Sequence, residues 1–188
     1  VDNDPDKARL TYRAIADKYP IQLTRNLAEA RSWLKSKARG SERYGLIASS
    51  GANRLRPDGI WIKSKVDAPV WFLNDKTDVR SSYYLEEVAS EFDIQGLELD
   101  WVCVGWDSDF RRVNDEWEHF SFRGTKWQRM NAADRQLYLK NTYRVLLTRA
   151  RQGMVIFVPP GDSSDPTRSP HVYDSIYEYL QLCGISSS

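Results

Sequence analysis

The stretch that decides the fold is NTYRVLLTRARQGMVIFVP, residues 141–159. Its first part has the pattern of an amphipathic helix end carrying Arg149 and Arg151, and Gly153 stands where such a helix would stop. Residues 154–158 form an uninterrupted apolar run, which is typical of a strand buried on both faces. The helix dipole favours arginine at a helix C-terminus, so a solvated cap explains these guanidinium groups as well as a ligand site does.

Three more apolar runs extend this pattern to the rest of the chain, at residues 45–49, 69–73 and 101–105. They are near-continuous rather than alternating, and helical segments separate several of them. Such runs indicate a parallel sheet with helices on both faces. We therefore predict an α/β fold with three layers and an open, mainly parallel sheet. Residues 21–24 fit a short edge strand, and residues 83–85 fit another short strand.

Helix signals lie between these runs. Asp4-Pro5 fits an N-cap followed by proline, and it opens a helix candidate over residues 4–19. Asn26 and Glu29 resemble a capping box, and apolar residues at helical spacing follow until Gly40. A third helix begins near residues 131–134 and runs into the opening stretch. The last helix has one apolar face and ends at Gly184, and the face comprises Tyr173, Ile176, Leu180 and Cys183.

The chain divides into three parts in this interpretation. Residues 1–20 are a helical lead-in from an upstream domain, residues 21–185 are one domain, and residues 186–188 are a tail. Residues 106–129 are a charged and aromatic insertion, in which alternation around Phe120 and Phe122 fits a hairpin. Because the chain starts with Val1 and not with methionine, we expect it to be a fragment of a longer protein.

Charge and cysteine content restrict the possible functions. The chain has 27 basic and 26 acidic residues, for a net charge of +1, so any nucleic-acid site must be local. Cys103 and Cys183 are far apart and suit neither a disulfide framework nor a metal site, which favours a reducing cytoplasmic compartment. No apolar run approaches the roughly 20 residues that span a bilayer, so we expect no membrane partner.

Several classes of catalytic site find little support in the sequence. His119 and His171 have no ligand partner at metal-binding spacing, so we predict no metal site. Acidic residues crowd residues 86–100, but no lysine follows Glu98 and Asp100 where a metal-dependent nuclease would need one. Ser49, Ser50 and Gly51 lack the frame of a hydrolase nucleophile elbow. The small residues after the strand at 45–49 instead favour close approach of a ligand at a carboxyl strand end.

Two motifs carry a family resemblance. Gln95-Gly96-Leu97-Glu98 before a strand resembles motif V of superfamily 1 helicases, and residues 146–151, LLTRAR, at a helix end before another strand resemble motif VI. Asn53-Arg54 after the strand at 45–49 is similar to motif IV. From about Asn26 to Ile185 the chain most resembles the C-terminal half of the DUF2075 proteins, the Schlafen group 3-like DNA/RNA helicase domain. The resemblance implies a second RecA-like domain.

The resemblance also implies roles for single residues. Arg149 matches the arginine finger that stabilises charge on the transferred phosphoryl group, so it is the candidate catalytic residue. Glu98 would contact the nucleotide ribose or the motif VI arginine, while Gln95 and Gly96 would shape the loop between ATP and the nucleic acid. Arg54 and Arg151 are further candidates for phosphate, or for ion pairs with Glu98 or Asp100. Glu98 and Arg151 also fit a surface ion pair without ligand function.

The sequence contains no G-x-x-x-x-G-K-[ST] loop and no convincing acidic pair for Mg²⁺ at a strand end. In the family both belong to the first RecA-like domain. We therefore expect ATP and Mg²⁺ as cofactors of the full-length protein, with none bound to this chain alone. The upstream first RecA-like domain is the predicted partner. The chain by itself should be inactive, and the joined protein should hydrolyse ATP.

DNA or RNA, in single-stranded form, is the second predicted partner. Aromatic and basic residues in the insertion could stack on unpaired bases, although such residues also form local mini-cores. The candidate contacts are Ser49, Ser50, Trp106, Arg123 and Trp127. Two alternatives to a motor domain stay open: a nucleic-acid-binding module without catalysis, and a scaffold that keeps only the fold.

Overall fold

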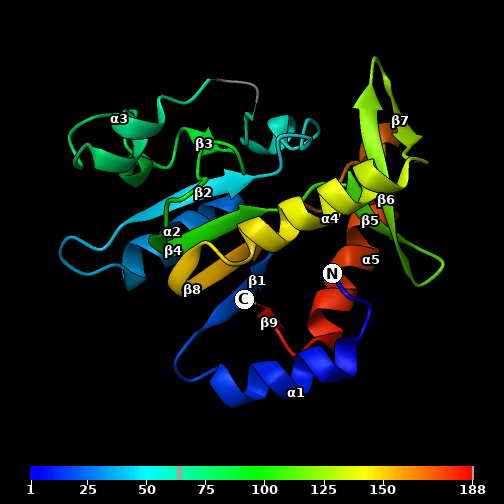
Figure 1. Cartoon of the computed structure of the whole chain (residues 1–188), viewed down its shortest axis with the longest axis horizontal. Coiled ribbons are helices and arrows are strands. Elements are labelled where there is room, and N and C mark those ends of the chain that lie inside the picture. Colours follow the sequence, from blue (N-terminus) through cyan, green and yellow to red (C-terminus); the bar gives the residue numbers. More distant parts are fainter. Residues whose placement is uncertain (63–64, 188) are drawn as a thin grey trace.

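The computed structural model of the chain describes residues 1–62 and 65–187. The described part forms a central sheet, a smaller ribbon and the helices around them (Figure 1). In chain order the elements are α1 Pro5–Ile15, β1 Ile21–Thr24, α2 Leu27–Lys37, β2 Tyr44–Ala48, η1 Arg56–Asp58, α3 Ala68–Leu73, η2 Ser82–Tyr84, β3 Val88–Ala89, β4 Leu99–Gly105, β5 Phe110–Val113, β6 Glu116–Arg123, β7 Lys126–Arg129, α4 Ala133–Leu146, β8 Ala150–Phe157, η3 Pro166–Arg168, α5 Pro170–Leu182 and β9 Ser186–Ser187.

The central sheet has the strand order β3-β2-β4-β8-β1-β9. Its neighbouring strands pair in parallel, with β4 at the centre against β2 on one side and β8 on the other. Ala48, Gly105 and Phe157 are register partners in turn, so the carboxyl ends of β2, β4 and β8 lie at the same edge. This is the predicted open parallel sheet, and it is consistent with a RecA-like α/β fold.

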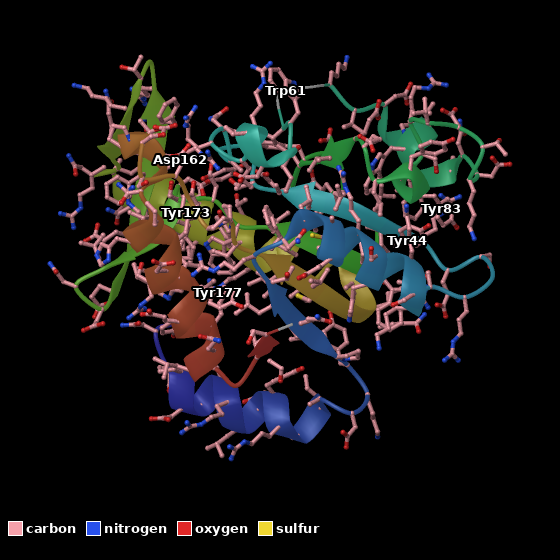
Figure 2. All side chains as sticks on the ribbon, turned by 180° about the vertical axis from the view of Figure 1, so that it is seen from behind. Tyr44, Trp61, Tyr83, Asp162, Tyr173 and Tyr177 are labelled. Carbon is pink, nitrogen blue, oxygen red and sulfur yellow. The ribbon has the colours of Figure 1, made fainter. Side chains whose placement is uncertain are left out.

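The central strands are apolar over most of their length because they face two cores. Along β4, Val102 and Val104 pack on the side of α4 and α5, whereas Trp101 and Cys103 pack on the side of α2. The residues of β2 and β8 divide in the same way. Figure 1 shows α4 crossing the near face of the sheet with α2 behind it, and Figure 2 shows α2 in front from the other side. The prediction of three layers is confirmed.

The apolar run at residues 69–73 is a helix, so its prediction as a strand was wrong. Asp67 caps α3 by accepting a hydrogen bond from Val70 N, and proline stands in its first turn. Of the run, Trp71 is fully buried, while Leu73 is exposed. Trp71 packs against Gly45 of β2, where an added Cβ would lie 2.7 Å from its ring. Trp71 is thus the residue through which this apolar run packs into the core.

Other predictions at the sheet edges also need correction. Residues 83–85 do not form a strand: they belong to the 3-10 turn η2 and its cap, with Leu85 in the left-handed region at φ 62°. The strand beyond this turn is β3, which sequence patterning missed. β1 is not the edge strand, because β9 pairs with its outer side. The predicted tail thus contributes two residues to the sheet.

The junction in the opening stretch also differs from the prediction. α4 ends at Leu146, and Gly153 lies inside β8 rather than at the helix stop. A Cβ at Gly153 would lie 2.6 Å from the carbonyl oxygen of Pro20 and 2.8 Å from the ring of Trp101. Glycine is therefore required at this position for close packing, and β8 begins at Ala150, before the apolar run.

The segment predicted as a hairpin insertion is a three-stranded antiparallel ribbon of β5, β6 and β7. Figure 1 shows the ribbon standing beyond the carboxyl end of the sheet, beside the start of α4. Phe120 and Phe122 alternate along β6 as predicted, opposite Arg129 and Trp127. The ribbon begins at Phe110, so Trp106 belongs to the end of the central sheet.

The terminal helices lie together on one side of the molecule. α1 packs against α5, and in Figure 1 α1 lies at the bottom while α5 runs from it up to the ribbon. Asp4 caps α1 through Lys7 N, and Asn26 caps α2 through Ala28 N and Glu29 N, as predicted. Gly184 ends α5 with φ 87°. Among the described residues, no helix has both the length and the apolar composition that crossing a bilayer demands.

Candidate functional site

Arg149 lies in the short turn between α4 and β8, at the amino end of the sheet. Its Nε donates to the Val145 carbonyl at 3.2 Å, and its Nη1 donates to the Leu97 carbonyl at 3.4 Å. The side chain is half-buried. No carboxylate in residues 1–62 or 65–187 forms an ion pair with it, and its Nη2 has no hydrogen-bond partner there. The guanidinium is held by neutral carbonyls and keeps donors for an anion.

Gln95 and Gly96 line the same cavity as Arg149, which has a volume of about 440 Å³. Gly96 has φ 79°, a left-handed turn that suits glycine. The two motifs meet because β4 and β8 are parallel neighbours, with Leu99 opposite Ala150 and Leu99 N donating to the Arg149 carbonyl at 3.0 Å. The structure thus brings together stretches that lie far apart in the sequence. We call this group the amino-end cavity.

Glu98 and Arg151 lie near the amino-end cavity, but they are not among its lining residues. Both side chains are exposed. In the part of the chain that the structure describes, neither Arg54 nor Arg151 forms an ion pair with Glu98 or Asp100. Asp100 instead accepts from Arg43 N at 2.8 Å and from the Gln152 side chain at 3.2 Å. A nucleotide contact of Glu98 or Arg151 stays a prediction.

Arg54 lies at the opposite edge of the sheet, because it follows β2 whereas Arg149 precedes β8. The 8 residues of β8 separate the two edges, which corresponds to about 25 Å. Arg54 N donates to Asp107 at 2.8 Å, and its guanidinium forms an ion pair with Asp165. The predicted nucleotide-binding residues therefore fall into two groups, and Arg54 does not share the amino-end cavity.

Ser49 and Ser50 bind buried carboxylates at this carboxyl edge. Ser49 Oγ donates to Asp109 at 2.8 Å and is itself almost fully buried. Ser50 donates to Glu91 from its backbone N–H at 2.8 Å and from its hydroxyl at 2.7 Å. Ser50 is exposed, so its hydroxyl is the one of the pair that a ligand can reach.

A buried acidic pair, Asp107 and Asp109, underlies the carboxyl edge. Tyr173 donates to Asp107 at 2.9 Å, and Tyr143 donates to Asp109 at 2.5 Å. Burial raises the pKa of Asp109 to about 7, and the negative charge of Asp107 adds to the effect. The pair joins α4 and α5 to the end of β4. Sequence reasoning missed it, although two aspartates directly after an apolar strand were a usable signal.

A second cavity, of about 610 Å³, lies between this edge, the ribbon and α4. Ser49, Ser50 and Asp109 contribute to its floor, and Phe120 and Phe122 come from the ribbon. It shares Glu91, Tyr138 and Thr142 with the amino-end cavity, so the two cavities are neighbours along α4. Glu91 also accepts from Thr142 at 3.4 Å and thereby links α4 to the Ser50 loop.

The three candidates for nucleic-acid contact from the predicted insertion are placed differently. Trp106 is 1% exposed and its indole N–H donates to the Phe110 carbonyl at 2.8 Å. It stacks on Phe110 and Trp117, so it is a core residue and offers no ring face to a base. Trp127 is half-buried and donates to the Thr167 carbonyl at 2.8 Å. Arg123 is exposed at the end of β6.

Among the described residues, no group of three or more histidine, cysteine, aspartate or glutamate side chains has an arrangement that could hold a metal ion. Cys103 and Cys183 are both buried free thiols, and burial raises the pKa of Cys103 to about 12.

Comparison with known families identifies the type of domain. Residues 1–160 match the profile of the Schlafen group 3, DNA/RNA helicase domain. No curated protein and no solved structure matches the chain. The match begins before Asn26 and ends before Ile185, so its extent differs from that of the resemblance read from the motifs. The matched residues include the ribbon and both segments of the amino-end cavity, the one with Gln95 and the one with Arg149. The chain belongs to the family of the Schlafen group 3, DNA/RNA helicase domain.

Proposed function

We propose that this chain is the second motor domain of an ATP-dependent superfamily 1 helicase or translocase. In this proposal Arg149 acts on the γ-phosphate of a nucleotide whose phosphate loop and Mg²⁺ ligands belong to a first RecA-like domain. One observation carries the proposal: a half-buried arginine with no acidic partner in the described residues shares a cavity with Gln95 and Gly96.

The residues of the amino-end cavity fit a phosphate group. Two neutral carbonyls orient the Arg149 guanidinium without neutralising it, so its charge remains available for an anion. Charge builds up on the transferred phosphoryl group, and an arginine supplied from a neighbouring domain stabilises it there. ATP bound with Mg²⁺ supplies the phosphoryl group. This chain contributes the positive charge and the Gly96 turn beside it.

Nucleic acid is the proposed substrate of the motor, in keeping with the helicase-domain family. The lining residues that the two cavities share along α4 support a link between the nucleotide end and the carboxyl edge. Glu91 lies between them and binds both Ser50 and Thr142. Only Phe92, Asp93 and Ile94 separate Glu91 from Gln95 in the chain, so Glu91 is the proposed point at which the two ends are coupled.

The test uses the protein in which this chain is joined to the domain that carries the phosphate loop. Arg149→Ala should lower kcat for ATP hydrolysis at least about 100-fold while KM for ATP changes little, because the arginine acts mainly in the transition state. Arg149→Lys should recover only part of the rate, since lysine lacks the planar fork. An unchanged ATPase rate in Arg149→Ala would refute the assignment.

Arg144→Ala is the matched control. Arg144 lies in the last turn of α4, just before the turn that carries Arg149; it is exposed and pairs at 2.6 Å with Asp2 on the surface. Its loss should leave the ATPase rate within about twofold, because exposed ion pairs contribute little. The isolated 188-residue chain should show no arginine-dependent ATPase. If the isolated chain hydrolyses ATP and the activity depends on Arg149, the site is not shared between two domains, and the chain binds the phosphates itself.

A further inference from the structure

A third cavity, of about 230 Å³, lies at the carboxyl edge between the loop after β2 and the ribbon. We call it the edge pocket, and five of its lining residues matter here: Asn53, Arg54, Arg56, Trp61 and Phe122. It is on the far side of the sheet from Arg149. Only Arg54 among the five belongs to the predicted site residues, so this group was not recognised from the sequence.

Aromatic rings and guanidinium groups form the walls of the edge pocket. The Arg56 guanidinium lies 3.2 Å from the centre of the Trp61 ring, and the Arg54 guanidinium lies 5.1 Å from that of Phe122. Trp61 is 37% exposed, and Figure 2 shows it on a loop at the surface of the molecule. Flat unsaturated ligands stack on both kinds of group. The walls therefore suit a planar ring.

Two polar atoms in the pocket wall lack partners. Asn53 Oδ1, an acceptor, and Arg54 Nε, a donor, are buried and make no hydrogen bond to any of residues 1–62 and 65–187. An unsatisfied buried polar atom costs about 1–3 kcal/mol, which a ligand with matching groups would relieve. An acceptor and a donor on successive residues can match the edge of a nucleobase, where amino or imino N–H groups stand beside ring nitrogens or carbonyl oxygens.

We propose that the edge pocket binds one unpaired nucleobase, which stacks on Trp61 and hydrogen-bonds to Asn53 and Arg54. This inference rests on the proposed nucleic-acid function, and it identifies the edge pocket as a site that binds the nucleic-acid strand. Arg56 is exposed at the mouth and meets the flanking phosphate, whereas the Arg54 charge is shared with Asp165. About 25 Å of sheet separates this base from the nucleotide at Arg149, so the two ligands are distinct.

The first experiment measures binding of a fluorescein-labelled single-stranded oligothymidylate to the 188-residue chain by anisotropy. Stacking contributes about 1–3 kcal/mol per base, so Trp61→Ala should weaken binding about tenfold and Trp61→Phe should retain most of the affinity. The salt dependence should stay the same in Trp61→Ala and become shallower by about one unit in Arg56→Ala. Tyr84→Ala removes an exposed aromatic elsewhere, and should bind like wild type.

A second measurement avoids any dependence on the folding of the variants. The wild-type chain is photo-crosslinked to an oligonucleotide that contains 4-thiothymidine, and the crosslinked peptides are identified. Peptides with Trp61 or Phe122 are expected. Competition by thymidine monophosphate separates the two sources of a base: effective competition indicates a free nucleotide as the ligand, and failure to compete indicates a base within a strand.

The outcomes separate this inference from the proposed function. Unchanged binding by Trp61→Ala, or crosslinks only outside the edge pocket, would overturn the base site and leave the Arg149 assignment standing. Loss of binding in Trp61→Ala with no rescue by phenylalanine would also overturn it, because stacking requires only a ring. If Arg149→Ala leaves ATP hydrolysis unchanged while Trp61 is needed for oligonucleotide binding, the motor role fails and the base site remains.

Discussion

Gly153 is the position in β8 where the structure makes the sharpest prediction about stability. A Cβ there would lie 2.6 Å from the Pro20 carbonyl oxygen, whereas ordinary contact begins at 3.4 Å. Gly153→Ala therefore forces β8 and the segment before β1 apart by roughly 0.8 Å, unless another part of the core gives way. The Trp101 ring, 2.8 Å from the same Cβ, blocks movement in the other direction.

Two costs follow from this displacement. Overpacking a well-packed core costs about 1–3 kcal/mol. The Pro20 oxygen also accepts from Met154 N at 3.0 Å, and losing this hydrogen bond costs about 1 kcal/mol. We expect Gly153→Ala to lower the free energy of unfolding by about 2–4 kcal/mol. For a chain of this length that corresponds to a fall in Tm of roughly 4–16 °C.

Urea unfolding followed by far-UV circular dichroism measures this loss, with a thermal scan as a second measurement. Gly124→Ala is the control, because Gly124 has φ 60° and no atom within 4 Å of an added Cβ. It should cost only the strain of a left-handed alanine, about 1–2 kcal/mol. A Gly153→Ala protein within about 0.5 kcal/mol of wild type would refute the contact argument. So would a greater loss in Gly124→Ala than in Gly153→Ala.

Two further predictions concern buried charges. Burial raises the pKa of Asp109 to about 7, while the unfolded carboxyl titrates near about 4, so the folded chain holds the extra proton between these values. The free energy of unfolding should fall as pH rises from about 4 to 7, and Asp109→Asn should flatten this slope in urea titrations; an unchanged slope contradicts the assignment. Arg168 is buried and donates to both oxygens of the partly buried Asp58 at 2.8 and 2.6 Å, so Arg168→Met should cost up to about 3–5 kcal/mol by leaving this carboxylate unpaired. The double variant with Asp58→Asn should recover part of this loss, and equal losses in the single and double variants would show that the charge is not the cause.

The fold was largely predictable because three of the four apolar runs are strands that meet a core on each face. The run at 69–73 misled because hydrophobicity over five residues does not distinguish a strand from one and a half turns of helix. Asp67 and Pro69 were the better signal, since they form a helix start. β3 and β9 are two residues long, and so short a strand is specified by its neighbours and not by its own sequence.

The direction of the strands predicts which candidate site residues lie at the same edge of the sheet. Gln95 and Arg149 both precede strands that pair in parallel, so they meet at one edge. Arg54 follows a strand, and this alone places it at the other edge. Which aromatic residues of the insertion reach the surface could not be predicted, because Trp106 and Trp127 differ in tertiary packing and not in local sequence. The edge pocket likewise depends on how the ribbon packs against the loop with Trp61.

The short outer strands of the central sheet have a consequence for self-association. A long unpaired edge offers a template on which another chain can add a strand, and this sheet ends in β3 and β9, each 2 residues long. The outer strand of the ribbon, β7, presents Lys126 and Arg129 as exposed charges. Charged and short edges disfavour strand addition. The strands most prone to aggregation, β4 and β8, are thus kept in the middle of the sheet.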